Sequence, residues 1–230
     1  MHFEDVYPSN ISKFRIASEQ LVIMHFVNAH LCCQLLYRHL LQILVHIPFP
    51  ILAPISQIKE YVFSGCRSLT QIKLPSTVVS IGRDAFNECS SLTKICLPDT
   101  VHTIEEFAFN GCSSLTDFSI PSSITTLADY TFNDCKAIQH ITIPFNVTKI
   151  GNDVFNACSS LREISIPESV KSIGSYSFCG CTALEKLVIP KSVTILKEDA
   201  FSGCSKLKSV TINAQLTVIN EYTFNRCVSL

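Results

Sequence analysis

The sequence predicts a solenoid built from 23-residue units, and three observations support this fold class. Phenylalanine and cysteine, three residues apart, recur every 23 residues without an insertion. Apolar and polar residues alternate in each unit over a short stretch that ends, in most units, at proline. Hydrophobic residues make up 47% of the chain, which argues against disorder. A fixed period of roughly 20 to 50 residues is typical of stacked repeats. The periodic positions are Phe63, Phe86, Phe109, Phe132, Phe155, Phe178, Phe201 and Phe224, with Cys66, Cys89, Cys112, Cys135, Cys158, Cys181, Cys204 and Cys227.

Residues 1–47 precede the repeats and contain a polar lead followed by an apolar stretch, 21–47, whose only formal charge is Arg38. The stretch exceeds the length of about 18 apolar residues that spans a membrane. Its polar residues, however, recur every four positions and mark one face of a helix. They are His30, Gln34, Arg38, Gln42 and His46.

Three interpretations of this N-terminal helical segment are open. It caps the first coil of the solenoid, it attaches the protein to a membrane as an uncleaved signal anchor, or it does not fold with the repeats. A cleaved signal peptide is disfavoured because the apolar stretch starts late and is long. The cluster of His30, Cys32, Cys33 and His39 lacks paired-ligand spacing, so we expect no metal there.

The repeats divide into a degenerate first unit, 48–68, and seven complete units within 69–230. In the unit 92–114, residues 94–97 alternate polar and apolar, as in a half-buried strand, and Pro98 ends that strand. Val101 and Ile104 predict a second extended piece. The spacing of the next apolar residues predicts one short helical turn, formed by Ala108, Phe109 and Cys112.

Equivalent side chains of neighbouring units are expected to stack about 4.8 Å apart, in a parallel strand sheet on one face of the solenoid. Stacked cysteines have parallel Cα–Cβ bonds, which do not suit the disulfide dihedral angle. We therefore expect buried, reduced thiols at the periodic sites. Cys96 falls on an outward strand position and should be exposed, whereas Cys179 belongs to a local loop.

The pattern Leu92-x-x-Ile95-x-Leu97-Pro98-x-x-Val101-x-x-Ile104-x-x-x-Ala108-Phe109-x-x-Cys112 resembles the BspA-type leucine-rich repeat, also called the Treponema pallidum type. Residues 69–230 carry this resemblance, and 55–68 match the second half of the motif. The resemblance implies a leucine-rich-repeat solenoid that acts in protein binding. It also implies a surface or extracellular protein, in some members an adhesin for host matrix proteins.

The outward positions of the predicted strands form the candidate protein-binding face. Their charges alternate in sign along the array, although a merely solvated surface would show the same composition. These positions are Gln71, Lys73, Lys94, Cys96, Asp117, Ser119, His140, Thr142, Glu163, Ser165, Lys186, Val188, Ser209 and Thr211.

A second variable column precedes each periodic phenylalanine by two residues. Aromatic residues are enriched at interface hot spots, but a structural role beside the phenylalanines also accounts for them. The column holds Tyr61, Asp84, Phe107, Tyr130, Asp153, Tyr176, Asp199 and Tyr222.

Composition and motifs exclude several functions. The net charge is −1 and no basic cluster is present, so nucleic acid is not an expected partner. No phosphate loop, zinc-protease motif or nucleophile elbow occurs, so we expect neither catalysis nor a cofactor. The leading hypothesis is a surface interaction or adhesion protein; the alternative is an intracellular, cytoplasmic scaffold. An uncovered coil face at Leu230 also predicts that the chain either associates end to end or is a fragment of a longer array.

Overall fold

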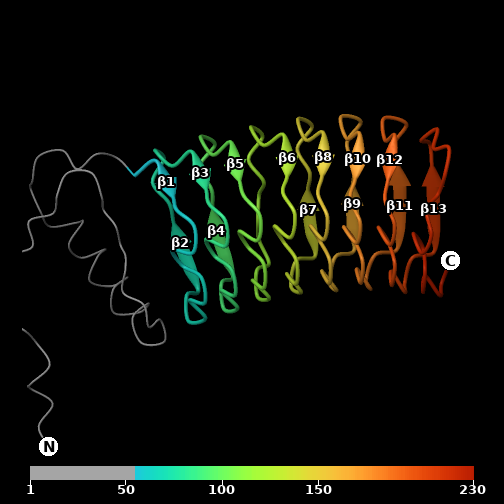
Figure 1. Ribbon diagram of the computed structural model, residues 1–230. Coiled ribbons are helices and arrows are strands. Elements are labelled where there is room, and N and C mark those ends of the chain that lie inside the picture. Colours follow the sequence, from blue (N-terminus) through green and yellow to red (C-terminus); the bar gives the residue numbers. More distant parts are fainter. Residues whose placement is uncertain (1–54) are drawn as a thin grey trace, which may run out of the picture.

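The computed structural model describes residues 55–230, which form a solenoid of stacked coils (Figure 1). The predictions for the N-terminal segment, for its histidine and cysteine cluster, and for the first part of unit 48–68 lie outside these residues. Within 55–230, no helix is of a length and apolarity that would cross a membrane.

Each complete coil contributes to one or both of two rows of short parallel strands (Figure 1). Both rows follow from the sequence pattern, because buried residues alternate with exposed ones along each strand. The first row comprises β2 (Gln71–Lys73), β4 (Lys94–Cys96), β7 (His140–Thr142), β9 (Glu163–Ser165), β11 (Lys186–Ile189) and β13 (Ser209–Ile212). The second row comprises β1 (Gln57–Ile58), β3 (Ser80–Ile81), β5 (Thr103–Ile104), β6 (Thr126–Leu127), β8 (Lys149–Ile150), β10 (Ser172–Ile173) and β12 (Ile195–Leu196).

The register between coils equals the sequence period. Ile72 pairs with Ile95, and Ile150 pairs with Ile173, each 23 residues apart and parallel. The ladders are interrupted, however. The first row contains three two-stranded sheets, and the second row contains the sheets β1-β3-β5 and β6-β8-β10-β12. The expected sheet is therefore present as short segments of ladder.

The third part of each coil forms consecutive turns, and the expected short helical turn is absent: no helix occurs in residues 55–230. The turns contain hydrogen bonds between residues three apart, such as Cys112 N–H to Phe109 C=O. Helix geometry cannot continue there because Phe107 and Gly111 both have positive φ, at 58° and 71°. The spacing of apolar residues indicated a turn correctly but did not reveal this reversal of backbone handedness.

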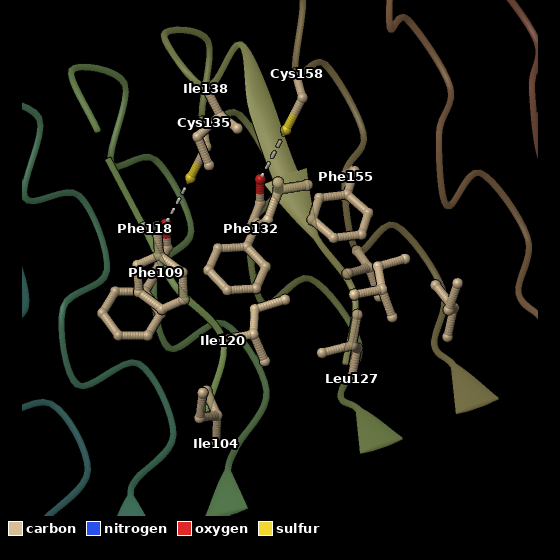
Figure 2. Packing of buried hydrophobic residues seen from close by; sticks show 14 of the residues in the cluster. Ile104, Phe109, Phe118, Ile120, Leu127, Phe132, Cys135, Ile138, Phe155 and Cys158 are labelled. Carbon is tan, nitrogen blue, oxygen red and sulfur yellow. Dashed lines mark hydrogen bonds between the residues drawn. The ribbon is translucent and has the colours of Figure 1, made fainter. Parts of the chain in front are cut away.

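The periodic phenylalanines form a continuous ladder through the core. Phe109, Phe132 and Phe155 stack with centroids 5.7 Å and 5.6 Å apart, and all three side chains are fully buried (Figure 2). Phe118 stands where other coils carry an aliphatic residue of the first-row strand, and it packs edge-on against Phe109 and Phe132. The prediction that like residues stack on like is thus confirmed for the phenylalanines.

The periodic cysteines form a second ladder, in which each thiol donates a hydrogen bond to the phenylalanine carbonyl 26 residues earlier. Cys135 contacts Phe109 O at 3.2 Å and Cys158 contacts Phe132 O at 3.3 Å (Figure 2). Burial raises the pKa of the Cys158 thiol to about 12. Reduced thiols are present, as expected, at Cys89, Cys112, Cys135, Cys158, Cys181, Cys204 and Cys227.

Cys66, the first periodic cysteine, departs from this expectation because it is disulfide-bonded. The argument from parallel Cα–Cβ bonds concerns only neighbouring members of the ladder. It does not restrict a cysteine in the first coil, which has a ladder neighbour on one side only.

Pairing between neighbouring second-row strands coincides with glycine at one position of the coil. The position directly follows each second-row strand, and we call it the post-strand position. A Cβ on Gly82 would lie 2.8 Å from the backbone nitrogen of Glu60, so the coils approach closely there. The post-strand residues, in order, are Lys59, Gly82, Glu105, Ala128, Gly151, Gly174, Lys197 and Asn220.

Neighbouring coils pair in the second row wherever at least one of the two carries a post-strand glycine. Glu105 and Ala128 are adjacent, and β5 and β6 are unpaired at that junction. Lys197 and Asn220 are likewise adjacent, and the coil after β12 has no second-row strand; the Asn220 side chain donates to the Leu196 carbonyl instead. Both junctions that lack second-row pairing thus have side chains at the two adjacent post-strand positions.

Candidate protein-interaction face

All fourteen predicted outward residues lie at the surface, twelve of them on first-row strands. In β4, Lys94 and Cys96 are exposed while Ile95 between them is buried, and the same alternation holds in β2, β7 and β9. Asp117 and Ser119 are also exposed, although their coil has no first-row strand. The predicted orientation of this face, including the exposure of Cys96, is confirmed.

The register determines which outward side chains are neighbours. Gln71 lies beside Lys94 and Lys73 beside Cys96; further along, His140 neighbours Glu163. The remaining pairs are Thr142 with Ser165, Lys186 with Ser209, and Val188 with Thr211. Val188 is 50% exposed, which places an apolar side chain in an otherwise polar surface.

Part of the charge on this face is neutralised within the protein. Lys94 Nζ lies 2.7 Å from Asp117 Oδ2, and this hydrogen bond raises the pKa of Lys94. Lys208 similarly contacts Glu185 at 2.9 Å just before the strands β13 and β11, which lowers the pKa of Glu185. The alternating signs noted in the sequence thus include one ion pair, while Glu163 and Lys186 form none with residues 55–230.

The second variable column lies on a different part of the coil, in the turns after the second-row strands. All eight residues have positive φ, from 51° at Asp199 to 61° at Tyr61. Tyr61, Tyr176 and Tyr222 are 56%, 41% and 61% exposed. The sequence showed the column but not its left-handed backbone, and the recurrence of Asp there was the available indication.

Aromatic and acidic members of this column interact between coils. Phe107 and Tyr130 stack with centroids 4.5 Å apart. The Tyr130 hydroxyl donates to Asp153, and the Tyr176 hydroxyl donates to Asp199; each hydrogen bond raises the pKa of its tyrosine. Burial raises the pKa of Asp153. The ring stacking and the hydrogen bonds between coils agree with a structural role for part of this column, while some of its aromatic rings remain exposed.

Two shallow hollows lie between coils. One, of about 510 Å³, borders the unpaired junction of β5 and β6 and is lined by residues that include Arg83, His102 and Thr126. The other, of about 340 Å³, is lined by residues that include Arg162, Glu185 and Lys206. Among residues 55–230, no three histidine, cysteine or acidic side chains come together in a way that suits a metal ion.

Comparison with known proteins places the repeats in a family. The model of the BspA type leucine rich repeat region matches residues 44–162 and 148–230. A search of curated proteins gave no match.

The chain is also similar to solved structures, of which the T. pallidum protein shares its architecture. The leucine rich repeat protein of T. pallidum is 31% identical, with a TM-score of 0.63, over 70% of this chain and 76% of that one. A leucine-rich repeat protein from Bacteroides ovatus is 25% identical, with a TM-score of 0.46, over 70% and 59%. A leucine rich cell surface protein from Faecalibacterium prausnitzii is 24% identical, with a TM-score of 0.38, over 80% and 72%.

The 23-residue period, the parallel strand rows, the phenylalanine and cysteine ladders and the match over most of the chain lead to one assignment. The chain belongs to the family of BspA-type leucine-rich repeat proteins.

Proposed function

We propose that this chain is a non-enzymatic protein-binding module of a surface-exposed interaction or adhesion protein, and that its strand face contacts the protein ligand. One observation carries the proposal. The coils present fourteen exposed, chemically varied side chains on one face, twelve of them on strands that are paired in register, which suits recognition of an extended protein surface.

Two further features support it. Leucine-rich repeats are in general protein-interaction modules, and the resemblance noted in the sequence implies a surface location with host or matrix proteins as ligands. The two hollows between coils are shallow, whereas substrate sites are typically deep. Membrane attachment through 21–47 belongs to the same proposal.

An intracellular scaffold is the second candidate, because most periodic thiols are free. Disulfides persist in oxidising compartments, although stacking geometry disfavours disulfides between neighbouring cysteines of the ladder in any compartment. The disulfide at Cys66 weighs in the opposite direction.

Binding to immobilised matrix proteins tests the role of the strand face. The double variant Lys94→Ala, Asp117→Ala removes an ion pair from this face without leaving either charge unpaired, and we expect it to weaken capture. The matched control, Arg67→Ala with Glu88→Ala, removes an exposed ion pair of 3.2 Å from the turns and should not. Equal capture by both variants and the unchanged protein would contradict a role for the strand face.

Antibody labelling of source cells tests the location. We expect an antibody against residues 69–230 to label intact cells. Labelling that appears only after permeabilisation would exclude the surface location and favour the scaffold.

A further inference from the structure

The turns that follow the second-row strands form an acidic, aromatic edge along the solenoid. We define this edge as the three residues after each of those strands, with 220–222 in the last coil. Backbone hydrogen bonds join its successive coils, for example Asp84 N–H to Glu106 C=O and Tyr176 N–H to Glu198 C=O, so that equivalent residues stack. The edge comprises residues 59–61, 82–84, 105–107, 128–130, 151–153, 174–176, 197–199 and 220–222.

Charge is distributed unevenly between this edge and the rest of the chain. The net charge of the whole chain is −1, but acidic residues clearly outnumber basic ones on the edge. The acidic residues are Glu60, Asp84, Glu105, Glu106, Asp129, Asp153, Glu198, Asp199 and Glu221; the basic residues are Lys59, Arg83 and Lys197. The edge therefore favours a cationic partner.

The first coils show how the edge holds a cation. Arg83 places its guanidinium carbon 5.3 Å from the centroid of Phe107, and its Nε lies 3.4 Å from Asp84 Oδ2. Its Nη1 contacts Glu106 at 2.6 Å. Tyr61 belongs to the coil before Asp84, and Phe107 to the coil after it. The guanidinium of Arg83 thus lies beside Asp84, and the residues before and after Asp84 in the column, Tyr61 and Phe107, are aromatic.

The last coils repeat this triplet, and no cation among residues 55–230 forms an ion pair with its aspartate. Tyr176, Asp199 and Tyr222 are the equivalents of Tyr61, Asp84 and Phe107, and Glu198 stands in the position of Arg83. Tyr176 and Tyr222 lie two coils apart, about 9–10 Å, which leaves room beside Asp199 for a planar group in contact with one of the two rings, as Arg83 contacts Phe107. Among residues 55–230, Glu198, Asp199 and Glu221 take part in no ion pair.

We propose that the Tyr176–Asp199–Tyr222 triplet binds the guanidinium group of an arginine side chain from a partner protein. Asp199 accepts the Tyr176 hydroxyl and retains acceptor capacity for the guanidinium. Glu198 and Glu221 add negative charge at the same place. Arginine fits better than lysine because its planar group stacks on aromatic rings and pairs with carboxylates. This site lies outside the strand face and does not depend on the function proposed for that face.

The intermediate triplet, Tyr130–Asp153–Tyr176, is a poorer site. Asp153 is only 9% exposed and already accepts hydrogen bonds from Tyr130 and from Asn156 Nδ2 at 2.9 Å. Asn152 occupies the position of Arg83 and is engaged with Asp129 and with the backbone of Ser175. Binding is therefore expected at the last triplet.

Titration of the full chain, carrying ¹³C-labelled tyrosine rings, with arginine amide tests the proposal by NMR. We expect saturable shifts of the Tyr222 and Tyr176 ring signals, and smaller shifts with lysine amide at the same ionic strength. Tyr222→Ala should weaken arginine amide binding about two- to fivefold. Absence of saturable shifts, or equal responses to the two amides, would overturn the proposal.

Two variants separate a specific site from general attraction to acidic residues. Glu198→Arg supplies a guanidinium in the position of Arg83 and should abolish the response, whereas Glu163→Arg, with the same change of charge on the strand face, should leave it intact. Arg83→Ala should in turn create a new arginine amide response at the Phe107 ring, observed with labelled phenylalanine. Equal losses in the two Glu→Arg variants would show attraction by net charge alone and contradict the site.

Discussion

At the residue scale, the phenylalanine ladder is the part of the core most sensitive to truncation. Phe132 stacks between Phe109 and Phe155 and is fully buried. We expect Phe132→Ala to lower the free energy of unfolding by about 3–5 kcal/mol, because it leaves a cavity within the stack. Phe145, which is 72% exposed, provides the control, and Phe145→Ala should change stability by about 0.5 kcal/mol or less. Urea unfolding followed by circular dichroism measures both; similar losses would contradict the ladder.

The buried thiols make stability depend on alkaline pH. Burial raises the pKa of Cys89 and of Cys158 from 9.0 to about 12, so the folded protein keeps protons that the unfolded chain releases above pH 9. A group whose pKa is raised on folding stabilises the protein below its unfolded pKa, and this contribution is lost as the pH rises towards the folded pKa. Each such thiol should lower the free energy of unfolding by about 1.4 kcal/mol per pH unit between pH 9 and 12.

Urea unfolding at several pH values between 8 and 11 measures this slope. Cys158→Ala should make the slope shallower, since one of the titrating groups is removed. Cys96→Ala is the matched control because Cys96 is exposed, and it should leave the slope unchanged. A slope that is the same in all three proteins would contradict the assigned cause.

At the element scale, the post-strand residue determines whether neighbouring second-row strands pair. Ala128→Gly should allow β5 and β6 to approach and form the missing ladder, because Glu105 would then face a residue without a Cβ. We expect slower amide hydrogen exchange in Thr126 and Leu127. Ala183→Gly, away from the unpaired junction, controls for the flexibility that glycine introduces. Unchanged exchange in Ala128→Gly would show that another feature separates the strands.

The reverse substitution should disrupt an existing ladder. A Cβ on Gly174 would collide with the backbone carbonyl oxygen of Gly151, and backbone cannot move aside as a flexible side chain can. We expect Gly174→Ala to lower stability by about 1–3 kcal/mol and to speed exchange in β8 and β10. Ala200→Gly, in a neighbouring coil, is the control for nonspecific effects of changing a small buried residue. Gly65 is not a suitable control, although a Cβ there would meet nothing within 4 Å, because its φ is +72°. A loss confined to Ala200→Gly would contradict the steric role of Gly174.

The elements that the sequence predicted are those whose residues repeat in every unit. Ile95 and Ile104 recur as apolar residues in each coil, so both strand rows followed from periodicity, and so did the outward direction of Lys94 and Cys96. The interruptions of the ladders depend instead on pairs of adjacent coils, such as Glu105 facing Ala128. A single unit does not contain that information, so the break between β5 and β6 was not predictable from the motif.

The candidate sites likewise differ in whether a single repeat unit was enough to predict them. The strand face was predicted from alternation alone, because a period of two fixes which side chains point outward. The acidic, aromatic edge was visible only as a variable column, since its meaning depends on Arg83 reaching Phe107 in the next coil. A contact between different units, and the positive φ that positions it, are properties of the stacked molecule.

At the scale of the whole molecule, the last coil leaves apolar side chains uncovered. Val218 and Ile219 are 62% and 52% exposed, and Val228 and Leu230 are 82% and 58% exposed. In the preceding coil the equivalents of Ile219 and Leu230, which are Leu196 and Leu207, are both buried. A second copy of the chain offers the same kind of surface, and burying these side chains in contact is favourable. We therefore predict that a protein consisting of residues 1–230 alone associates reversibly through this coil.

Sedimentation equilibrium over a range of concentrations measures the association. Ile219→Lys with Val228→Lys should shift the chain towards monomer, because a charged side chain is costly to bury without a partner. Ile195, which is 51% exposed but lies in the preceding coil, provides the control, and Ile195→Lys should associate like the unchanged protein. A stable monomer at high concentration would contradict the prediction. Association that survives the double variant but is lost in Ile195→Lys would place the contact on the side of the solenoid rather than on its last coil.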